Sequence, residues 1–253
     1  MSRGAEKEHA IDNEPILPLA GHLRELRKRL IASLLAIGIA FLFTYSFSVE
    51  IYGLLAGPLL SSLPEGQRFV AFSTVTEPFV TYLKIGFVSA VFVASPVVIY
   101  EVWAFVAPGL YKDERRWFLP VVPASVILFV AGALFAHLVV FPVGFKYLLG
   151  FAGAELRPVL SMGAYFSLAT KFMLAFGVVF QIPVVILVLA RLGIVDARML
   201  VLWWKYAILS AFVIGAILTP PDVVSQFLMA VPIMLLYCIS IVVAYFFGEK
   251  RKG

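Results

Sequence analysis

The sequence has few of the residue types that build catalytic or metal centres. Cysteine occurs once in 253 residues, histidine occurs three times, and charged residues make up only 14%. The single cysteine, Cys238, excludes a disulfide framework and a cysteine-based metal site. No His/Cys/Asp cluster has metal-ligand spacing, and no phosphate loop or nucleophile–base pair on one helix is present. We therefore predict that the chain is not an enzyme and needs no cofactor.

Two further absences narrow the class of protein. The net charge is +5, but the basic residues form short clusters between apolar runs and not a basic stripe interleaved with aromatics, which argues against nucleic-acid binding. The segment Met1–Leu17 is polar and carries both signs of charge, unlike a cleaved signal peptide. We interpret residues 1–18 as a polar tail, with the first apolar run retained as a span.

Long apolar segments dominate what remains. Apolar residues make up 62% of the chain and the mean hydropathy is +1.00, more than a water-facing surface tolerates. Six segments approach the roughly 20 residues that a helix needs to cross a membrane. We predict an all-α, polytopic membrane protein, a single domain over residues 1–253 with a tail at 248–253. Its spans are expected at 30–47, 79–107, 117–141, 165–192, 200–218 and 227–247.

Prolines and loops predict the shape of the bundle. Proline removes a backbone donor and bends a helix, so we expect a curved, kinked bundle. The long connections 49–78 and 142–162 are expected to cap one face with short helices. The turn Thr219–Asp222 contains Pro220 and Pro221 and predicts an antiparallel hairpin of the last two spans, the first of them barely long enough to cross. Prolines within or near spans are Pro96, Pro120, Pro123, Pro183 and Pro232.

The distribution of Lys and Arg predicts orientation, because cytoplasmic loops retain positive charge. With the N-terminus inside, fifteen basic residues are cytoplasmic and three, Arg68, Lys146 and Arg157, lie outside. Both termini are therefore expected in the cytoplasm. The fifteen are Arg3, Lys7, Arg24, Arg27, Lys28, Arg29, Lys112, Arg115, Arg116, Arg191, Arg198, Lys205, Lys250, Arg251 and Lys252.

Two cytoplasmic segments mix acids with bases. In the first, His22–Leu30, leucines recur at helical spacing, which predicts an amphipathic helix leading into the first span. Glu25 is its only acid, and its simplest role is an ion pair with Arg29 one turn later. The second segment, Phe105–Arg116, has the composition of a cytoplasmic loop.

Four motifs together resemble the TatC family. They read HLRELRKR at His22–Arg29, PGLYKDE at Pro108–Glu114, FGVVFQIP at Phe176–Pro183 and TPPDVVSQ at Thr219–Gln226, in TatC order. The segment AGPL, which contains Pro58, and the run from Pro96 to Phe105 also match. The resemblance covers the chain from about Leu19 to the last span. Each motif alone is weak, whereas four in order are specific.

The resemblance implies a receptor and scaffold of the twin-arginine translocase in the bacterial inner membrane. Such a receptor binds signal peptides of folded proteins at the cytoplasmic face, draws on the proton motive force, assembles with TatA- and TatB-like single-span subunits, and self-associates. In the family, the carboxylates that match Glu25 and Glu114 are associated with binding the two arginines, whose planar forks suit carboxylates better than lysine does. We expect around them His22, Leu23, Arg27, Phe105, Leu110 and Tyr111, with structural roles for Pro58, Pro96, Pro220, Pro221, Asp222 and Gln226.

Two positions depart from the family pattern. Gln181, beside Pro183, stands where the family usually has glutamate, so a titratable acid is missing there and an amide contact to a freed backbone group or a partner helix is expected. Glu101 stands where glutamine is common, so it is either an extra acid near the recognition face or an acid that reaches the interface.

The alternative class is a secondary transporter for small solutes or ions. It would be built around Lys84, Lys171 and Glu101, because charges within spans mark functional sites. Lys84 and Lys171 lie near the outer ends of their spans, however, which favours snorkelling to the surface. No internal repeat is visible, which also argues against many transporter folds.

Overall fold

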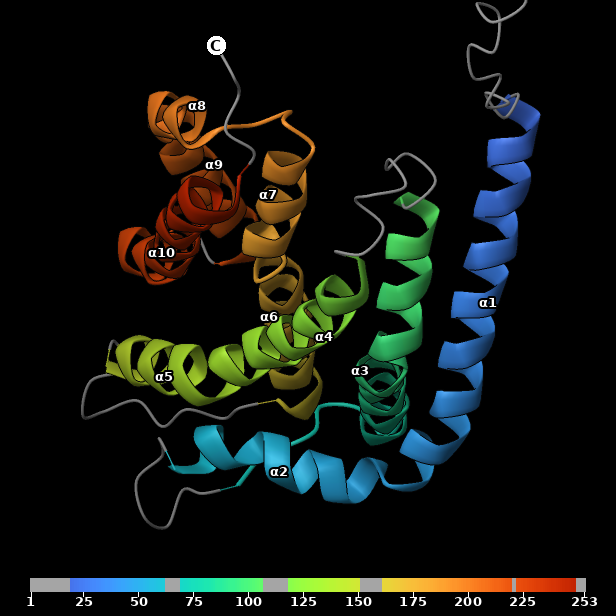
Figure 1. Ribbon diagram of the computed structural model, residues 1–253. Helices are drawn as coiled ribbons and strands as arrows, with labels where there is room; N and C mark the ends of the chain where they lie inside the picture. The colour runs from blue at the N-terminus through green and yellow to red at the C-terminus, as the bar shows by residue number, and fades with distance from the viewer. Residues whose placement is uncertain (1–18, 62–68, 107–117, 151–160, 220–221, 249–253) are drawn as a thin grey trace, which may run out of the picture.

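The computed structural model describes residues 19–61, 69–106, 118–150, 161–219 and 222–248. Within these ranges almost every residue lies in a helix, and the one β feature is an isolated bridge between Ala71 and Ser161 (Figure 1). The all-α prediction is confirmed. Five expected site residues fall outside the described ranges: Leu110, Tyr111, Glu114, Pro220 and Pro221.

The helices follow the apolar segments of the sequence. Among the residues that the structure describes, five helical stretches are long and apolar enough to cross a membrane, whereas α9, in the fifth expected span, has 15 residues. In chain order the elements are α1 (Leu19–Ser46), α2 (Ser48–Ser61), α3 (Glu77–Val106), α4 (Phe118–Phe135), η3 (Ala136–Val140), α5 (Phe141–Leu149), α6 (Met162–Val179), α7 (Ile182–Arg191), α8 (Ala197–Leu202), α9 (Trp204–Leu218) and α10 (Val223–Phe247).

The third span is longer than the sequence predicts. We expected it to end at Phe141, but α4 continues through the π-helical turn η3 into α5, which ends at Leu149. Pro142 does not stop the helix, because the wide turn bonds the N–H of Phe141 to the oxygen of Ala136 and leaves the proline in the first turn of α5. Residues 142–149 of the expected loop are therefore helical.

Prolines and local hydrogen bonds bend the other spans. The fourth span breaks between α6 and α7 at Phe180 and Gln181, with Pro183 in the first turn of α7. In α3, Pro96 cannot donate to the oxygen of Phe92, and the hydroxyl of Ser95 donates to that oxygen instead, at 2.7 Å. The fifth span breaks at Trp203, between α8 and α9.

The helices pack in a curved arrangement around α6. Figure 1 shows α1 lying along α3, α2 crossing one end of this pair, and α8 to α10 on the far side of α6 and α7. The start of α1 and the end of α10 lie toward the same end of the molecule (Figure 1). The buried core between α2, α5 and α6 is aromatic and includes Phe141, Phe166 and Phe176. Beside this core α1 packs along α3, and the candidate site depends on the register of that pair.

Candidate functional site

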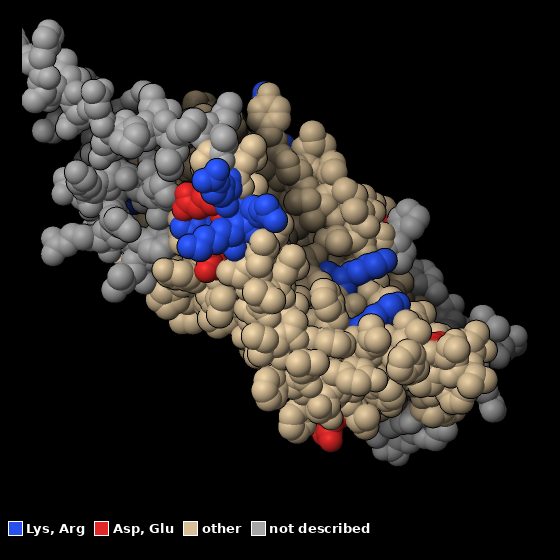
Figure 2. Space-filling model, turned by 90° about the vertical axis from the view of Figure 1, so that its right-hand side faces the viewer, with Lys and Arg blue, Asp and Glu red and all other residues tan. Residues whose placement is uncertain are grey.

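One arginine joins two acids at the end of the molecule where α1 begins. Arg29 donates to Oε1 of Glu25 from both Nη2, at 2.6 Å, and Nε, at 3.1 Å. Its third nitrogen, Nη1, donates to Oε2 of Glu101 at 3.0 Å. Each of the three side chains exposes about a quarter of its surface or less. Figure 2 shows Lys, Arg and acidic side chains gathered in one mixed cluster on the α1 side.

Helix geometry and packing place these three side chains together. Glu25 and Arg29 are one turn apart on α1 and therefore share a face. Glu101 lies on α3, which packs along α1 through Ala40, Ala90 and Ala94. Farther along, the hydroxyl of Thr44 donates to the oxygen of Gly86 at 2.7 Å, which holds the two helices in register. The close pairing of α1 and α3 thus brings Glu101 to Arg29.

A groove of about 520 Å³ opens beside the Arg29 pairs. The groove contains both carboxylates and is also lined by basic side chains. A cation that binds these acids must therefore make contacts strong enough to offset the repulsion from the neighbouring positive charges. Arginine meets this condition because its fork can engage a carboxylate through two parallel hydrogen bonds. The lining residues are Gly21, Arg24, Glu25, Lys28, Arg29, Ala32, Tyr100 and Glu101.

The remaining expected site residues on α1 and α3 divide into two groups. The rings of His22 and Phe105 stack with centroids 4.3 Å apart, so the structure brings these two together. Leu23 is 62% exposed and Arg27 is exposed, and neither lines the groove. Sequence reasoning did not identify Arg29 as a bridge between helices, because the helical spacing of the leucines in α1 does not show which residue of α3 lies opposite Arg29.

Gln181 and Pro183 form a separate polar site at the break between α6 and α7. The amide Nε2 of Gln181 donates to the backbone oxygen of Ser125 on α4 at 3.0 Å and to that of Gly177 at 3.4 Å. The hydroxyl of Ser125, which is fully buried, accepts from Nε1 of Trp103 at 2.9 Å. This network joins α3, α4 and the break, and it does not line the charged groove.

The other expected residues lie elsewhere. Pro58 and Pro96 are inside α2 and α3, while Asp222 caps α10 by accepting from the N–H of Ser225 at 2.8 Å, and Gln226 lies in the first turn of that helix. The backbone N–H and the hydroxyl of Ser225 donate to the Asp222 carboxylate and favour its ionised form, which lowers the pKa of this carboxyl. None of these residues lines the groove.

The two lysines within spans do not meet Glu101. Nζ of Lys84 donates to the hydroxyl of Ser167 at 3.2 Å, and Lys171 is exposed. Among the described residues, no three His, Cys, Asp or Glu side chains are grouped so that they could hold a metal ion.

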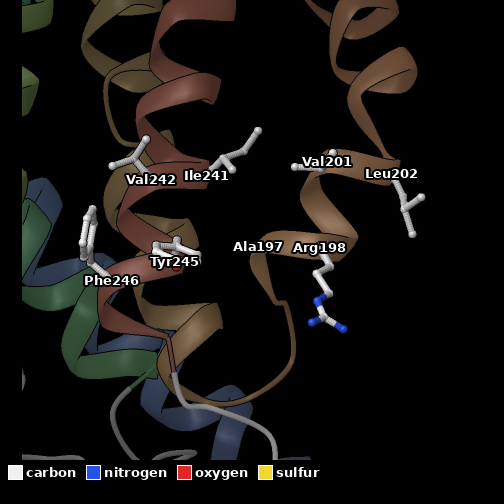
Figure 3. A pocket seen from close by; sticks show the side chains of 8 residues that line it. All are labelled: Ala197, Arg198, Val201, Leu202, Ile241, Val242, Tyr245 and Phe246. Carbon is white, nitrogen blue, oxygen red and sulfur yellow. The ribbon is translucent and has the colours of Figure 1, made fainter.

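A second large groove is chemically unlike the first. It has a volume of about 610 Å³ and lies between α8 and α10 (Figure 3). Its walls are apolar side chains such as Val201 and Ile241, and Arg198 points away from the hollow in Figure 3. With no carboxylate in its lining, this groove offers no acid that could pair bidentately with a guanidinium group.

The fold and site define a multi-pass α-helical membrane protein with a carboxylate groove at one end. A family model described as Sec-independent protein translocase protein (TatC) matches residues 21–232. A relative of that name from Desulforapulum autotrophicum is 43% identical over 253 residues, covering 100% of this chain and 90% of the relative. The Escherichia coli K12 protein of the same name is 39% identical over 240 residues, which are 95% of this chain and 93% of that protein.

Solved structures agree. A crystal structure of the twin-arginine translocase receptor TatC matches with a TM-score of 0.79 at 42% identity, over 88% of this chain and 97% of the other. A second crystal structure, in the detergent DDM, matches with a TM-score of 0.80 at 41% identity. The chain belongs to the TatC family and is a component of the Sec-independent protein translocase.

Proposed function

We propose that the chain is the core receptor of the twin-arginine translocase and that Glu25 and Glu114 hold the two arginines of a signal peptide. The observation that carries this proposal is the state of Glu25: its carboxylate lies in a groove and already accepts two hydrogen bonds from a guanidinium group. A site that holds one arginine has the chemistry to hold another. Glu114 lies 13 positions beyond Glu101, outside the described residues.

The electrostatics of the groove favour arginine over other cations. Arg24 and Lys28 line the same groove and repel small cations and single ammonium groups. An arginine offsets this repulsion through a planar fork of donors, whereas lysine offers a point charge and no fixed geometry. The surrounding bases therefore act against partners that lack the paired hydrogen bonds.

The location and energy source follow from the same proposal. The basic asymmetry of the sequence favours a cytoplasmic location for the groove end, on the side of the membrane where signal peptides are first exposed. The chain serves as a scaffold for TatA- and TatB-like single-span subunits and for further copies of itself. Transport of the folded cargo draws on the proton motive force and not on chemistry within this chain.

A photoreactive twin-arginine peptide tests the receptor proposal. Crosslinking in membranes is expected to label residues 21–32 and the segment around Glu101, and a twin-lysine peptide of the same length is expected to label them less. Labelling confined to the apolar groove between α8 and α10, or equal labelling by both peptides, contradicts the proposal.

The transporter alternative has less support. Two of its candidate charges do not pair with each other, because Lys84 bonds to Ser167 and Glu101 bonds to Arg29. A transporter predicts solute-coupled flux by the purified chain in liposomes. A receptor predicts peptide binding and no such flux.

A further inference from the structure

We propose that Arg29 is an internal occupant of the arginine site, which holds the position on Glu25 until an arginine of the signal peptide displaces it. Glu101 is the second acid, which stays paired with Arg29 when this happens. Glu101 thereby sets how strongly Arg29 competes with the peptide arginine for Glu25. This inference rests on the proposed function. The inference adds Arg29 and Glu101 to the receptor site as specificity-determining residues. It also gives a reason why the site prefers arginine.

The contacts of Arg29 reproduce what a peptide arginine requires. All three nitrogens of its guanidinium donate to carboxylates, two to Glu25 and one to Glu101. The two bonds to Glu25 both end on Oε1, and within the described part of the chain Oε2 of Glu25 accepts none. Arg29 therefore uses half of the carboxylate. A peptide arginine that engages both oxygens makes a better aligned pair.

Arg29 differs in this respect from the other bases of α1. Arg24, Arg27 and Lys28 are exposed, and no ion pair is formed by any of them within the described ranges. Arg29 is 23% exposed and bridges two helices. A pairing of this kind goes beyond the weak, exposed ion pair between neighbours on one helix that the sequence predicts.

Glu101 makes the displacement feasible. If Glu25 were the only partner, a peptide arginine would leave the guanidinium of Arg29 partly buried and unpaired, which is costly. Glu101 already accepts from Nη1 and keeps that contact when the other two bonds break. The exchange then replaces one arginine on Glu25 by another. A lysine of the peptide does not replace the lost contacts equally well. Its single ammonium group must displace two hydrogen bonds between Arg29 and Glu25 and lacks the planar fork that would replace both.

The first test compares Arg29→Gln with Lys28→Gln in the full-length chain, reconstituted in lipid nanodiscs. Both variants remove one positive charge from the same groove, so Lys28→Gln measures the general electrostatic gain for a cationic peptide. If the site is open for a tenth to a third of the time, removing the occupant tightens binding by about three- to tenfold. We expect this gain for Arg29→Gln beyond that of Lys28→Gln, and a larger gain for a twin-lysine peptide than for a twin-arginine peptide.

The second test is a cycle with Glu101→Gln. Alone, this change leaves Arg29 with Glu25 as its one partner, and we expect weaker binding of the twin-arginine peptide. In the Arg29→Gln background the same change is expected to weaken binding less than it does alone, by no more than the general electrostatic effect of one groove charge that Lys28→Gln measures. Arg29→Lys serves if Arg29→Gln does not fold, and an intermediate gain is expected because the charge remains but the fork is lost.

The outcomes separate this inference from the receptor proposal. If Arg29→Gln binds the twin-arginine peptide no better than Lys28→Gln while Glu25→Gln loses binding, Glu25 is the receptor site and Arg29 only positions it, which overturns the inference. If Glu25→Gln binds as tightly as wild type, the receptor proposal fails at that residue and the inference fails with it. If Glu101→Gln weakens peptide binding as much in the Arg29→Gln background as it does alone, the proposed role of Glu101 is overturned.

Discussion

The amide of Gln181 donates to the backbone oxygen of Ser125 across a distance of 3.0 Å, from the break between α6 and α7 to the interior of α4. A second, longer bond of 3.4 Å reaches the oxygen of Gly177, one turn earlier in α6. At the break, the N–H of Gln181 bonds to the oxygen of Val178. The side chain therefore joins two helices where the regular hydrogen bonding of one of them is interrupted.

Gln181→Leu and Gln181→Glu test this contact. Leucine loses the donor, and we expect a loss of about 1 kcal/mol of stability. An ionised glutamate has acceptors only and faces a carbonyl oxygen, so we expect a larger loss. Melting temperatures of the purified chain in detergent measure both effects. Wild-type melting temperatures for both variants would show that the amide makes no polar contact. Improved crosslinking of Gln181→Glu to a partner subunit would show that Gln181 replaces a working acid.

Close packing of α4 on α6 leads to a second prediction. A Cβ added to Gly132 would overlap the backbone oxygen of Phe176, so the two helices must move apart. We expect Gly132→Ala to cost about 1 to 3 kcal/mol. Gly38→Ala is the matched control, because an added Cβ there meets nothing within 4 Å. If thermal melting finds the two variants equally stable, the packing of α4 on α6 is not as close as described.

Asp222 predicts a dependence of stability on pH. Hydrogen bonds from Ser225 lower the pKa of Asp222 from its ordinary value of 3.8. A lowered pKa means that the cap contributes fully above pH 3.8 and that this contribution is lost as the pH falls through the folded pKa. The difference in melting temperature between wild type and Asp222→Ala is expected to be constant near neutral pH and to shrink below pH 3.8.

Asp222→Asn is the control for this prediction. Asparagine caps a helix without titrating, so the difference between Asp222→Asn and Asp222→Ala is expected not to depend on this ionisation. A gap between wild type and Asp222→Ala that persists below the folded pKa would mean that the charge of Asp222 does not contribute to the cap.

The orientation of the chain is tested by cysteine labelling. After Cys238→Ser, single cysteines at Ser2, Lys112, Arg198 and Lys252 are expected to be protected from an impermeant thiol reagent added outside intact cells, because basic residues favour the cytoplasmic side. Thr74→Cys, in the exposed connection between α2 and α3, is the accessible control. External labelling of Lys112→Cys would contradict the predicted orientation.

The helices were predictable from the sequence because a segment in lipid must satisfy its backbone internally, so long apolar runs leave few alternatives. The predicted end of the third span before Pro142 was wrong, because the residue composition does not indicate a π-helical turn ahead of a proline. The pair of Glu25 and Arg29 follows from a spacing of four residues. The contact from Arg29 to Glu101 spans 72 positions and depends on the register of α1 against α3, which small residues such as Ala90 and Gly86 set only in three dimensions.

The most direct measurement is the affinity of the full-length chain in nanodiscs for a twin-arginine peptide. Removing one partner of a partly buried charge pair costs about 2 to 5 kcal/mol, so Glu25→Gln and Glu114→Gln are each expected to weaken binding at least tenfold. Glu50→Gln, on α2, is the control and is expected to bind as wild type does. A twin-lysine peptide is expected to bind wild type less tightly and to lose less in both variants. If the double variant Glu25→Gln/Glu114→Gln binds the twin-arginine peptide as tightly as wild type, the receptor site does not depend on these acids.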